Sequence, residues 1–378
     1  MRHLLPCLLG ASLWLLSLYG EEEIEFLKRK EGDQLVLSVS NGAYLPMQVR
    51  LSGALAGYES DHPFPILATL PPRSVPDLAR LTPAKGATRL SMKVSLEAWP
   101  GDPGRVPDTN VTYLFPWAHG VRHAVGQGYG GAFSHQGLKA LDFDLAEGEA
   151  IHAARGGIVV RILSNFTRGG LDPALISQGN ILDVLHDDGT VAHYDHLRAH
   201  GTVRRLGEHV AAGDLLAYCG HTGYGSGAHL HFEVTRARAA EKPLAIPTFF
   251  AGPGGQRLVA EEGLWYTALH PGKPPVKAPP PIETLFREWS ALTNAVARTG
   301  SVQLRGEQRE DRFLLYIQNG YDRQITLKIT LESKNLGPLT EAGNPVLCPA
   351  LCETLFGVYR VLRAGEKIRY GMSYELLP

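Results

Sequence analysis

Two histidines separated by a single residue offer the clearest chemistry in this chain. They are His229 and His231, in the run 227–234, which reads Gly-Ala-His-Leu-His-Phe-Glu-Val. Apolar and polar residues alternate through this run, which is typical of a β-strand. Residues two apart in a strand point to the same face, so both imidazoles would project side by side into one pocket. They could share a metal site, one as a ligand and one as a proton carrier, or they could simply be solvated.

Further metal-binding side chains precede this strand. Three short segments carry them: 134–137 (Ser-His-Gln-Gly), 141–144 (Leu-Asp-Phe-Asp) and 194–197 (Tyr-Asp-His-Leu). A catalytic zinc site usually takes three protein ligands and leaves a fourth position for water. His135, Asp142 and His231 would satisfy that count. His196 and His229 would remain as second histidines near the metal, able to accept a proton from water or to stabilise an oxyanion.

The elements that must position these residues are mostly strands. Short alternating or apolar runs, broken by Gly, Pro, Asn and Asp, indicate a mainly β protein. The best helix candidate is 283–296. The proline-rich stretch 271–281 is typical of an extended, semi-rigid linker.

An internal repeat relates the two ends of the chain. The run 35–42 (Leu-Val-Leu-Ser-Val-Ser-Asn-Gly) matches 313–320 (Phe-Leu-Leu-Tyr-Ile-Gln-Asn-Gly), and the alternation resumes at the same offset after each Asn-Gly. Two strands joined near Asn-Gly are typical of a hairpin. We therefore predict two small β-sandwich-like modules, one on each side of a central domain, with a hairpin at each Asn-Gly.

The N-terminus is typical of a secretory signal peptide. It has a basic start, an apolar run from Leu4 to Leu18 and a small residue, Gly20, before three glutamates. We expect an exported protein, periplasmic or secreted, with no stable membrane span after signal removal; an uncleaved anchor is the alternative. In an exported chain Cys348 and Cys352 could form a local disulfide, whereas Cys219 is expected to be a buried apolar residue.

Composition limits the classes of function. The 378 residues suffice for two or three domains, and 44% hydrophobic with 20% charged residues indicates folded globular domains. The formal net charge of −1 gives no electrostatic reason to expect a nucleic-acid partner.

Several other residues near the motifs allow two interpretations. The run 127–131 (Gln-Gly-Tyr-Gly-Gly) could line a cleft or only form a turn. Asn180 could hydrogen-bond loop backbone or substrate. His193 is expected to point away from Tyr194, toward solvent or core.

Taken together, the motifs resemble those of the lysostaphin-type (LytM-like) zinc metallopeptidases, which hydrolyse peptide cross-links in bacterial peptidoglycan. The resemblance rests on the order SHxG, D, GN, YxHL, GxTG and HLHFEV, and it covers roughly 113–234. It implies that His135, Asp142 and His231 bind Zn²⁺ and that His196 and His229 are catalytic. The implied partners are peptidoglycan stem peptides or cross-bridges.

This sequence departs from the commoner family pattern at one point. Six residues separate His135 from Asp142, where the family usually has three. The longer spacing leaves Asp144 as an alternative ligand, but Asp142 holds the position before Phe143 that the pattern requires.

The expected organisation follows the motifs. We predict a signal peptide at 1–20, an N-terminal β-module at 21–112, a zinc peptidase domain at 113–250, a proline-rich linker with a short helix at 251–295, and a C-terminal β-module at 296–378. The resemblance implies a central antiparallel sheet of the duplicated-hybrid-motif type in the peptidase domain. The predicted function is that of an exported zinc endopeptidase acting on peptidoglycan. The alternatives are a zinc peptidase acting on proteins and a non-enzymatic cell-wall regulator on the same fold.

Overall fold

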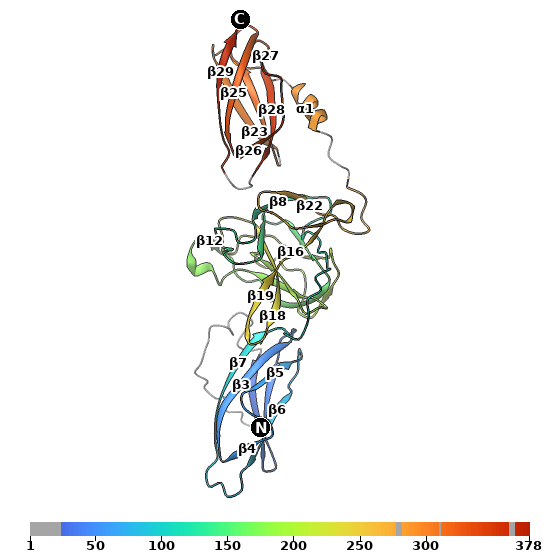
Figure 1. The fold of residues 1–378 in the computed structure, drawn as a ribbon, viewed down its shortest axis with the longest axis vertical. Helices are drawn as coiled ribbons and strands as arrows, with labels where there is room; N and C mark the ends of the chain where they lie inside the picture. The colour runs from blue at the N-terminus through green and yellow to red at the C-terminus, as the bar shows by residue number, and fades with distance from the viewer. Residues whose placement is uncertain (1–23, 277–281, 293, 310, 363–366) are drawn as a thin grey trace. The chain divides into compact units, whose positions relative to one another are not determined.

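The computed structural model describes residues 24–276, 282–292, 294–309, 311–362 and 367–378 (Figure 1). The predicted signal peptide and part of the predicted linker lie outside these residues. The chain separates into two compact units: Met1–Ala118, Gly137–Ala140 and Leu145–Val259 form unit 1, and His119–Gln136, Leu141–Asp144 and Ala260–Pro378 form unit 2. Antiparallel strands dominate both units, which confirms the mainly β fold class.

Unit 1 begins with two sheets that enclose an apolar core (Figure 1). The first sheet has the order β1-β2-β6-β4 and consists of β1 (Ile24–Glu31), β2 (Gln34–Asn41), β6 (Asp77–Pro83) and β4 (Tyr58–Ser60). The second has the order β5-β3-β7 and consists of β5 (Ile66–Leu70), β3 (Met47–Ala56) and β7 (Ser91–Pro100). Leu37 and Val39 of β2 are buried with Val49 and Leu51 of β3, because alternate side chains of each strand face the opposite sheet.

The rest of unit 1 contains the strands that carry the histidine motifs. They form an antiparallel run in the order β15-β11-β13-β14-β18, and β19 also pairs with β18. Their bounds are β15 (His209–Val210), β11 (Gly157–Leu163), β13 (Ile181–Leu185), β14 (Val191–Asp195), β18 (Leu230–Arg238) and β19 (Glu241–Ile246). The register of β14 and β18 places Asp195 opposite His231.

Short ladders complete unit 1. They pair β10 (Ala150–His152) with β16 (Leu215–Tyr218), β12 (Gly169–Gly170) with β17 (Gly223–Tyr224), and β20 (Phe250–Ala251) with β21 (Arg257–Leu258). Two short 3₁₀ turns, η2 (Pro173–Leu175) and η3 (Pro253–Gly255), lie between them in the chain. The parallel β12–β17 ladder joins two loops that lead to the histidines.

Unit 2 begins with three short paired strands. β8 (Arg122–Gln127) pairs with β9 (Ala140–Phe143) on one side and with β22 (Trp265–Thr267) on the other. The register of β8 and β9 places Gln127 opposite Asp142.

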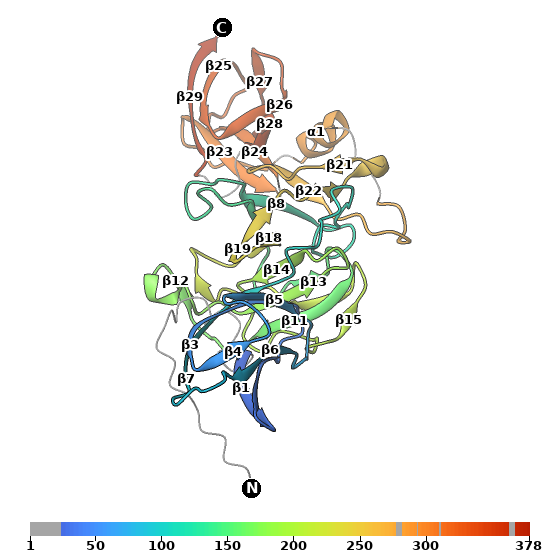
Figure 2. The same cartoon turned by 60° about the horizontal axis from the view of Figure 1, so that its bottom comes forward.

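The C-terminal module of unit 2 repeats the strand order of the N-terminal module. Its strands are drawn in orange and red in Figure 2. One sheet has the order β23-β24-β28-β26 and consists of β23 (Val302–Arg309), β24 (Arg312–Asn319), β28 (Glu353–Val361) and β26 (Leu336–Glu341). The other has the order β27-β25-β29 and consists of β27 (Val346–Cys348), β25 (Ile325–Lys334) and β29 (Arg369–Leu377). The two modules therefore have the same strand order.

The prediction of a hairpin at each Asn-Gly is wrong. Strand β2 pairs with β1 and β6, whereas β3 pairs with β5 and β7, so the chain crosses from one sheet to the other at Asn41. The asparagine side chain explains why. Asn41 Nδ2 donates to the carbonyls of Leu45, Leu70 and Pro71, and Asn319 Nδ2 donates to those of Arg323, Cys348 and Pro349. Each asparagine holds the sheet crossing together from within the core.

Two further expectations differ from the structure. The helix α1 (Ile282–Ser290) is shorter than 283–296, because Ala295 forms a β-bridge with Cys352 and leaves helical geometry. Cys348 and Cys352 are free thiols, so the possible disulfide is not formed. Cys219 is fully buried, as predicted, and burial raises the pKa of its thiol to about 12.

Candidate metal centre and histidine pair

His135 and Asp142 lie together within unit 2. Asp142 is in the short strand β9, where its neighbours Leu141 and Phe143 are buried. His135 is 1% exposed and follows β8 in a loop. Its Nδ1 lies 3.1 Å from the carbonyl oxygen of Gly128 and donates a hydrogen bond to it. Its Nε2 lies 3.3 Å from Asp142 Oδ1.

His196, His229 and His231 lie together within unit 1. His196 follows the end of β14, His229 precedes β18 and His231 is the second residue of β18. The ring centroids of His196 and His229 are 4.5 Å apart, and those of His196 and His231 are 6.0 Å apart. The alternation read from the sequence therefore places both histidines of the His-Leu-His segment beside His196.

Backbone carbonyls fix the two rings that are not predicted ligands. His196 Nδ1 lies 2.7 Å from the carbonyl oxygen of Thr222, and His229 Nδ1 lies 2.9 Å from that of Gly227. Each Nδ1 donates a hydrogen bond to its carbonyl, which fixes the orientation of each ring. His196 has a left-handed backbone with φ of 62°, a conformation that a non-glycine residue rarely adopts, so its ring is held at a specific angle.

Asn180 secures the loop behind His196. Its Nδ2 donates to the carbonyls of Phe166 and Leu197, its Oδ1 accepts from the Phe166 N–H, and its side chain is fully buried. Of its two predicted roles, the structure shows the backbone one. Thr222 also bonds this loop, because its Oγ1 accepts from the Asn180 N–H and donates to the Leu197 carbonyl.

Three of the predicted site residues form a group that could hold a metal ion. His135, Asp142 and His231 each offer one ligand atom, and these atoms all lie within 4.8 Å of one another. Two imidazoles and one carboxylate are a donor set that zinc uses in catalytic sites. Ligand atoms at about 2.0–2.2 Å from a tetrahedral zinc are about 3.3 Å apart, which matches the separation of His135 Nε2 and Asp142 Oδ1. The residues present therefore fit the ion that the resemblance implies.

Asp144, the alternative ligand, is not a member of this group. Burial, together with the nearby charge of Asp142, raises its pKa to about 6. Burial also raises the pKa of Asp195 to about 6, despite the favourable charge of His231 opposite it.

His193 occupies a buried ion pair that the sequence did not reveal. Its Nδ1 lies 2.8 Å from Asp183 Oδ1, and its Nε2 lies 2.9 Å from Thr235 Oγ1. Arg161 also approaches Asp183, which is fully buried. Burial alone would lower the pKa of His193, but the charge and hydrogen bond of Asp183 outweigh it and raise this pKa to about 9. The only available signal was the position of Asp183 and His193 on strands whose apolar neighbours indicate burial.

The three candidate ligands and the His196–His229 pair are residue types that metal-dependent hydrolases use. Residues 135–243 match Peptidase family M23, a segment that contains all five predicted site residues. The resemblance read from the sequence is confirmed over this segment. No curated protein matches the chain.

Several solved structures are similar to part of this chain. The catalytic domain of the antimicrobial peptidase lysostaphin from Staphylococcus simulans is 20% identical, with 33% of this chain and 87% of that chain covered and a TM-score of 0.24. A catalytic-domain variant of the prophage-encoded M23 protein EnpA from Enterococcus faecalis is 21% identical, with 39% and 95% covered and a TM-score of 0.27. LytU is 25% identical, with 38% and 86% covered and a TM-score of 0.25.

Among the residues that the structure describes, none of the helices has the length and apolar character needed to cross a membrane.

Proposed function

We propose that this chain is an exported zinc endopeptidase that hydrolyses peptide cross-links of bacterial peptidoglycan. The observation that carries the proposal is the His135–Asp142–His231 group inside a segment that matches a peptidase family. These three residues would hold Zn²⁺, and their donor set and the 3.3 Å spacing of two of them fit that ion. Bound zinc lowers the pKa of a water molecule to roughly 7 and polarises a carbonyl.

The two remaining histidines handle protons and charge. Backbone carbonyls orient the rings of His196 and His229 through Nδ1, so Nε2 is the ring atom that would accept a proton from the attacking water. Once protonated, the same ring donates to the leaving amine or stabilises the developing oxyanion. With ring centroids 4.5 Å apart, the two rings can serve one scissile peptide bond.

Export of the enzyme is part of the proposal. Its support is the basic start, apolar run and small residue of the first 20 positions. After signal removal the enzyme would act in the periplasm or outside the cell, where peptidoglycan is found. The mass of the N-terminal peptide of the protein recovered outside the cytoplasm tests this part: a first residue near position 21 is expected, and an intact Met1 would contradict it.

Digestion of purified peptidoglycan tests the activity. Release of soluble muropeptides is expected from the full chain, with loss on chelation and recovery when zinc is restored. Mass spectrometry of defined muropeptides then identifies the bond cleaved. Casein cleavage without muropeptide release would indicate a peptidase acting on proteins, and zinc binding with neither cleavage would indicate a cell-wall regulator.

Substitution of one proposed catalytic histidine separates catalysis from folding. His229→Ala is expected to lower the rate of muropeptide release by at least about 100-fold, since general acid–base groups contribute 10²- to 10⁴-fold. Retained zinc would show that the site is intact. His209→Ala is the matched control, because His209 is exposed in β15 and belongs to no predicted site. Equal rates for both variants and the wild type would contradict the assigned role.

A further inference from the structure

A buried glutamine connects the two ligand residues of unit 2. Gln127 is the last residue of β8 and is only 7% exposed. Its Nε2 donates to Asp142 Oδ2 at 2.9 Å and to Ser134 Oγ at 2.8 Å. Its Oε1 accepts from the N–H groups of Phe133 and Ser134 at 3.0 and 3.1 Å. One side-chain amide thus bonds the carboxylate of Asp142 and the loop that leads into His135.

The two halves of this amide act on different ligands. Because Nε2 occupies Asp142 Oδ2, the other oxygen, Oδ1, is the one presented to His135 Nε2. Because Oε1 fixes the backbone at Ser134, the next residue, His135, enters the site from a defined position. The carbonyl oxygen of Gly128, the residue after Gln127, then accepts the Nδ1 proton of His135.

The neighbouring glycine makes room for this amide. A Cβ at position 131 would lie 2.3 Å from Gln127 Cγ and 2.9 Å from Oε1, so any larger residue would displace the side chain. A glutamine is also neutral, so it can donate to the carboxylate of Asp142 without adding negative charge beside it. The glycine-rich run 127–131 is therefore more than a turn, because Gly131 leaves the space that the side chain of Gln127 occupies.

We propose that Gln127 is a positioning residue for the metal centre, orienting Asp142 and His135 together. The inference rests on the proposed function, since it concerns the same zinc ligands. Outer-shell partners of metal ligands typically change metal affinity by about 10- to 100-fold when they are removed. Gln127 bonds Asp142 directly and acts on His135 through the backbone of Ser134, so its removal should change zinc affinity by an amount in that range.

Zinc affinity of the full chain, measured by competition with a chromophoric chelator, tests the proposal. Gln127→Met keeps the length of the side chain and removes all four hydrogen bonds. Gln48→Met is the matched control, because Gln48 is also 7% exposed and bonds Arg238 and Ala240 in unit 1 through both ends of its amide. The zinc dissociation constant should rise about 10- to 100-fold in Gln127→Met and stay within about 2-fold of wild type in Gln48→Met.

Cobalt substitution gives a second measurement. The visible absorption of bound Co²⁺ depends on ligand geometry, so it should shift in Gln127→Met and not in Gln48→Met. If Gln127→Met does not fold, Gln127→Asn takes its place, because the shorter amide should not reach both Asp142 and the backbone of Phe133 and Ser134. Wild-type zinc affinity in the Gln127 variant, or an equal loss in the Gln48 variant, would overturn the proposal. A wild-type chain that binds no zinc would instead overturn the proposed function and this inference with it.

Discussion

The N-terminal and C-terminal β-modules have the same strand order but different outer faces. In the N-terminal module the outer face of β2 and β6 places Ser38 opposite Asp77. In the C-terminal module the corresponding positions of β24 and β28 hold Tyr316 opposite Leu355. A register shift precedes Ser38 and Tyr316 alike, so the backbones match where the side chains differ.

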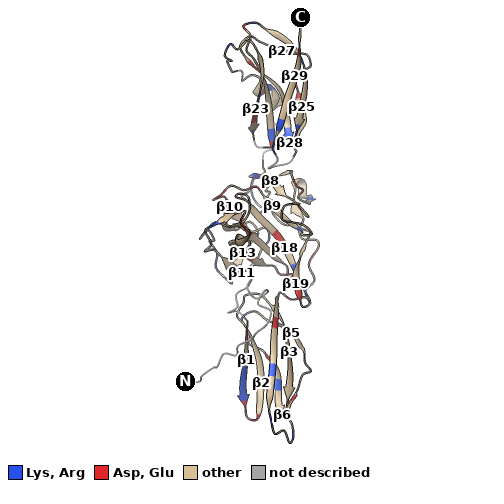
Figure 3. Ribbon diagram, turned by 90° about the vertical axis from the view of Figure 1, so that its left-hand side faces the viewer, with Lys and Arg blue, Asp and Glu red and all other residues tan. Residues whose placement is uncertain are grey.

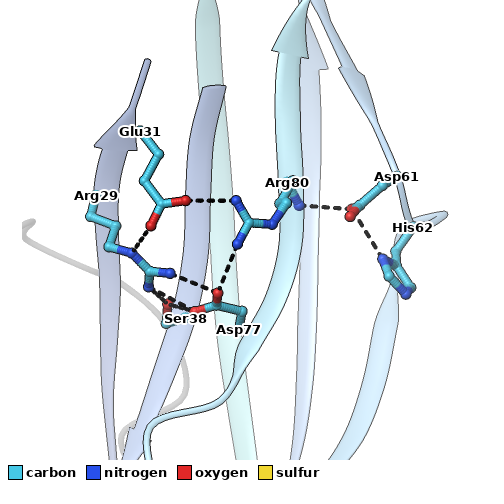
Figure 4. Close-up of polar contacts among 7 residues, drawn as sticks. All are labelled: Arg29, Glu31, Ser38, Asp61, His62, Asp77 and Arg80. Carbon is cyan, nitrogen blue, oxygen red and sulfur yellow. Dashed lines mark hydrogen bonds and ion pairs between the residues drawn. The ribbon is translucent and has the colours of Figure 1, made fainter. Parts of the chain in front are cut away.

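The polar face of the N-terminal module carries a ladder of ion pairs. Figure 3 shows both basic and acidic residues along these strands, and Figure 4 shows the ladder itself. Arg29 donates two hydrogen bonds of 2.7 Å to Asp77, and Arg80 donates one of 2.7 Å to Glu31. The four charges balance, and their side chains are 34% to 46% exposed.

The apolar face of the C-terminal module is covered by helix α1. Leu314, Tyr316, Leu355 and Val358 pack against Ile282, Phe286 and Trp289 of the helix. The interior of the two sandwiches obeys one pattern, whereas the outer face is polar where it meets solvent and apolar where a helix lies on it. The two modules thus both have apolar side chains between their sheets and differ in the side chains of the outer face.

The largest effect is expected at the feature that the modules share. Asn41→Ala and Asn319→Ala each leave three buried or part-buried carbonyls without their donor, which should lower the free energy of unfolding of that module by about 4 kcal/mol. Hydrogen exchange of the full chain, read separately for β2–β3 and β24–β25, measures both. Asn165→Ala, at an exposed position, is the control. If only one of the two variants lost protection in its own module, the two asparagines would not be structurally equivalent.

The buried ion pair of His193 offers a contrast to the exposed ladder. The pKa of His193 is raised from 6.5 to about 9, so its contribution to stability is complete below pH 6.5 and is lost as the pH rises through 9. The groups that face it are Asp183, Thr235 and, by charge, Glu233 and Asp195. The wild type should lose on the order of 3 kcal/mol across this window.

His193→Gln should abolish that pH dependence, as measured by urea unfolding at several pH values. His62→Gln is the control, because His62 pairs with Asp61 at the surface of the N-terminal module and its side chain is 60% exposed. An unchanged pH profile in His193→Gln would show that the buried pair does not control stability in this range.

The covered face should be sensitive to truncation. Leu355→Ala removes apolar contacts beneath α1 and should lower the free energy of unfolding by about 2 kcal/mol, with faster hydrogen exchange in 282–290. Leu376→Ala, at a leucine that is 43% exposed on β29, should have a much smaller effect. Equal effects would mean that the helix does not stabilise this face.

Local periodicity explains which parts of the site could be predicted. The strand period of two placed His229 and His231 on one side, and the short motif around Asp142 marked a second ligand. Gln127 and Asp183 could not be found in the same way, because their partners are brought together only by pairing of β8 with β9 and of β13 with β14. A single sequence does not encode which polar residues of separate strands meet.

The fold shows the same division. Alternating runs located the strands of both modules, and the shared Asn-Gly register revealed their repeat. The hairpin prediction was wrong because Asn-Gly occurs in two settings. It can form a tight turn between paired strands. Here the asparagine amide instead bonds carbonyls 29 and 30 residues further along the chain. Only the folded chain distinguishes them, through the burial of Asn41 and Asn319.

The smallest effect is expected in the ion-pair ladder itself. Hydrogen bonds from Arg29 and Ser38 lower the pKa of Asp77 to about 2, so its stabilising contribution is present above pH 3.8 and is lost as the pH falls through about 2. Because the ladder is solvated, Asp77→Asn should lower the thermal midpoint only slightly at low salt, and the difference should vanish near 1 M salt, where the Debye length is about 3 Å. Asp33→Asn, an equal charge change at an exposed turn, controls for net charge. A large loss of stability that persists in high salt would show that the polar face stabilises its module as much as the face beneath α1 does. The two modules would then differ in the type of side chain on the outer face and not in how much that face contributes to stability.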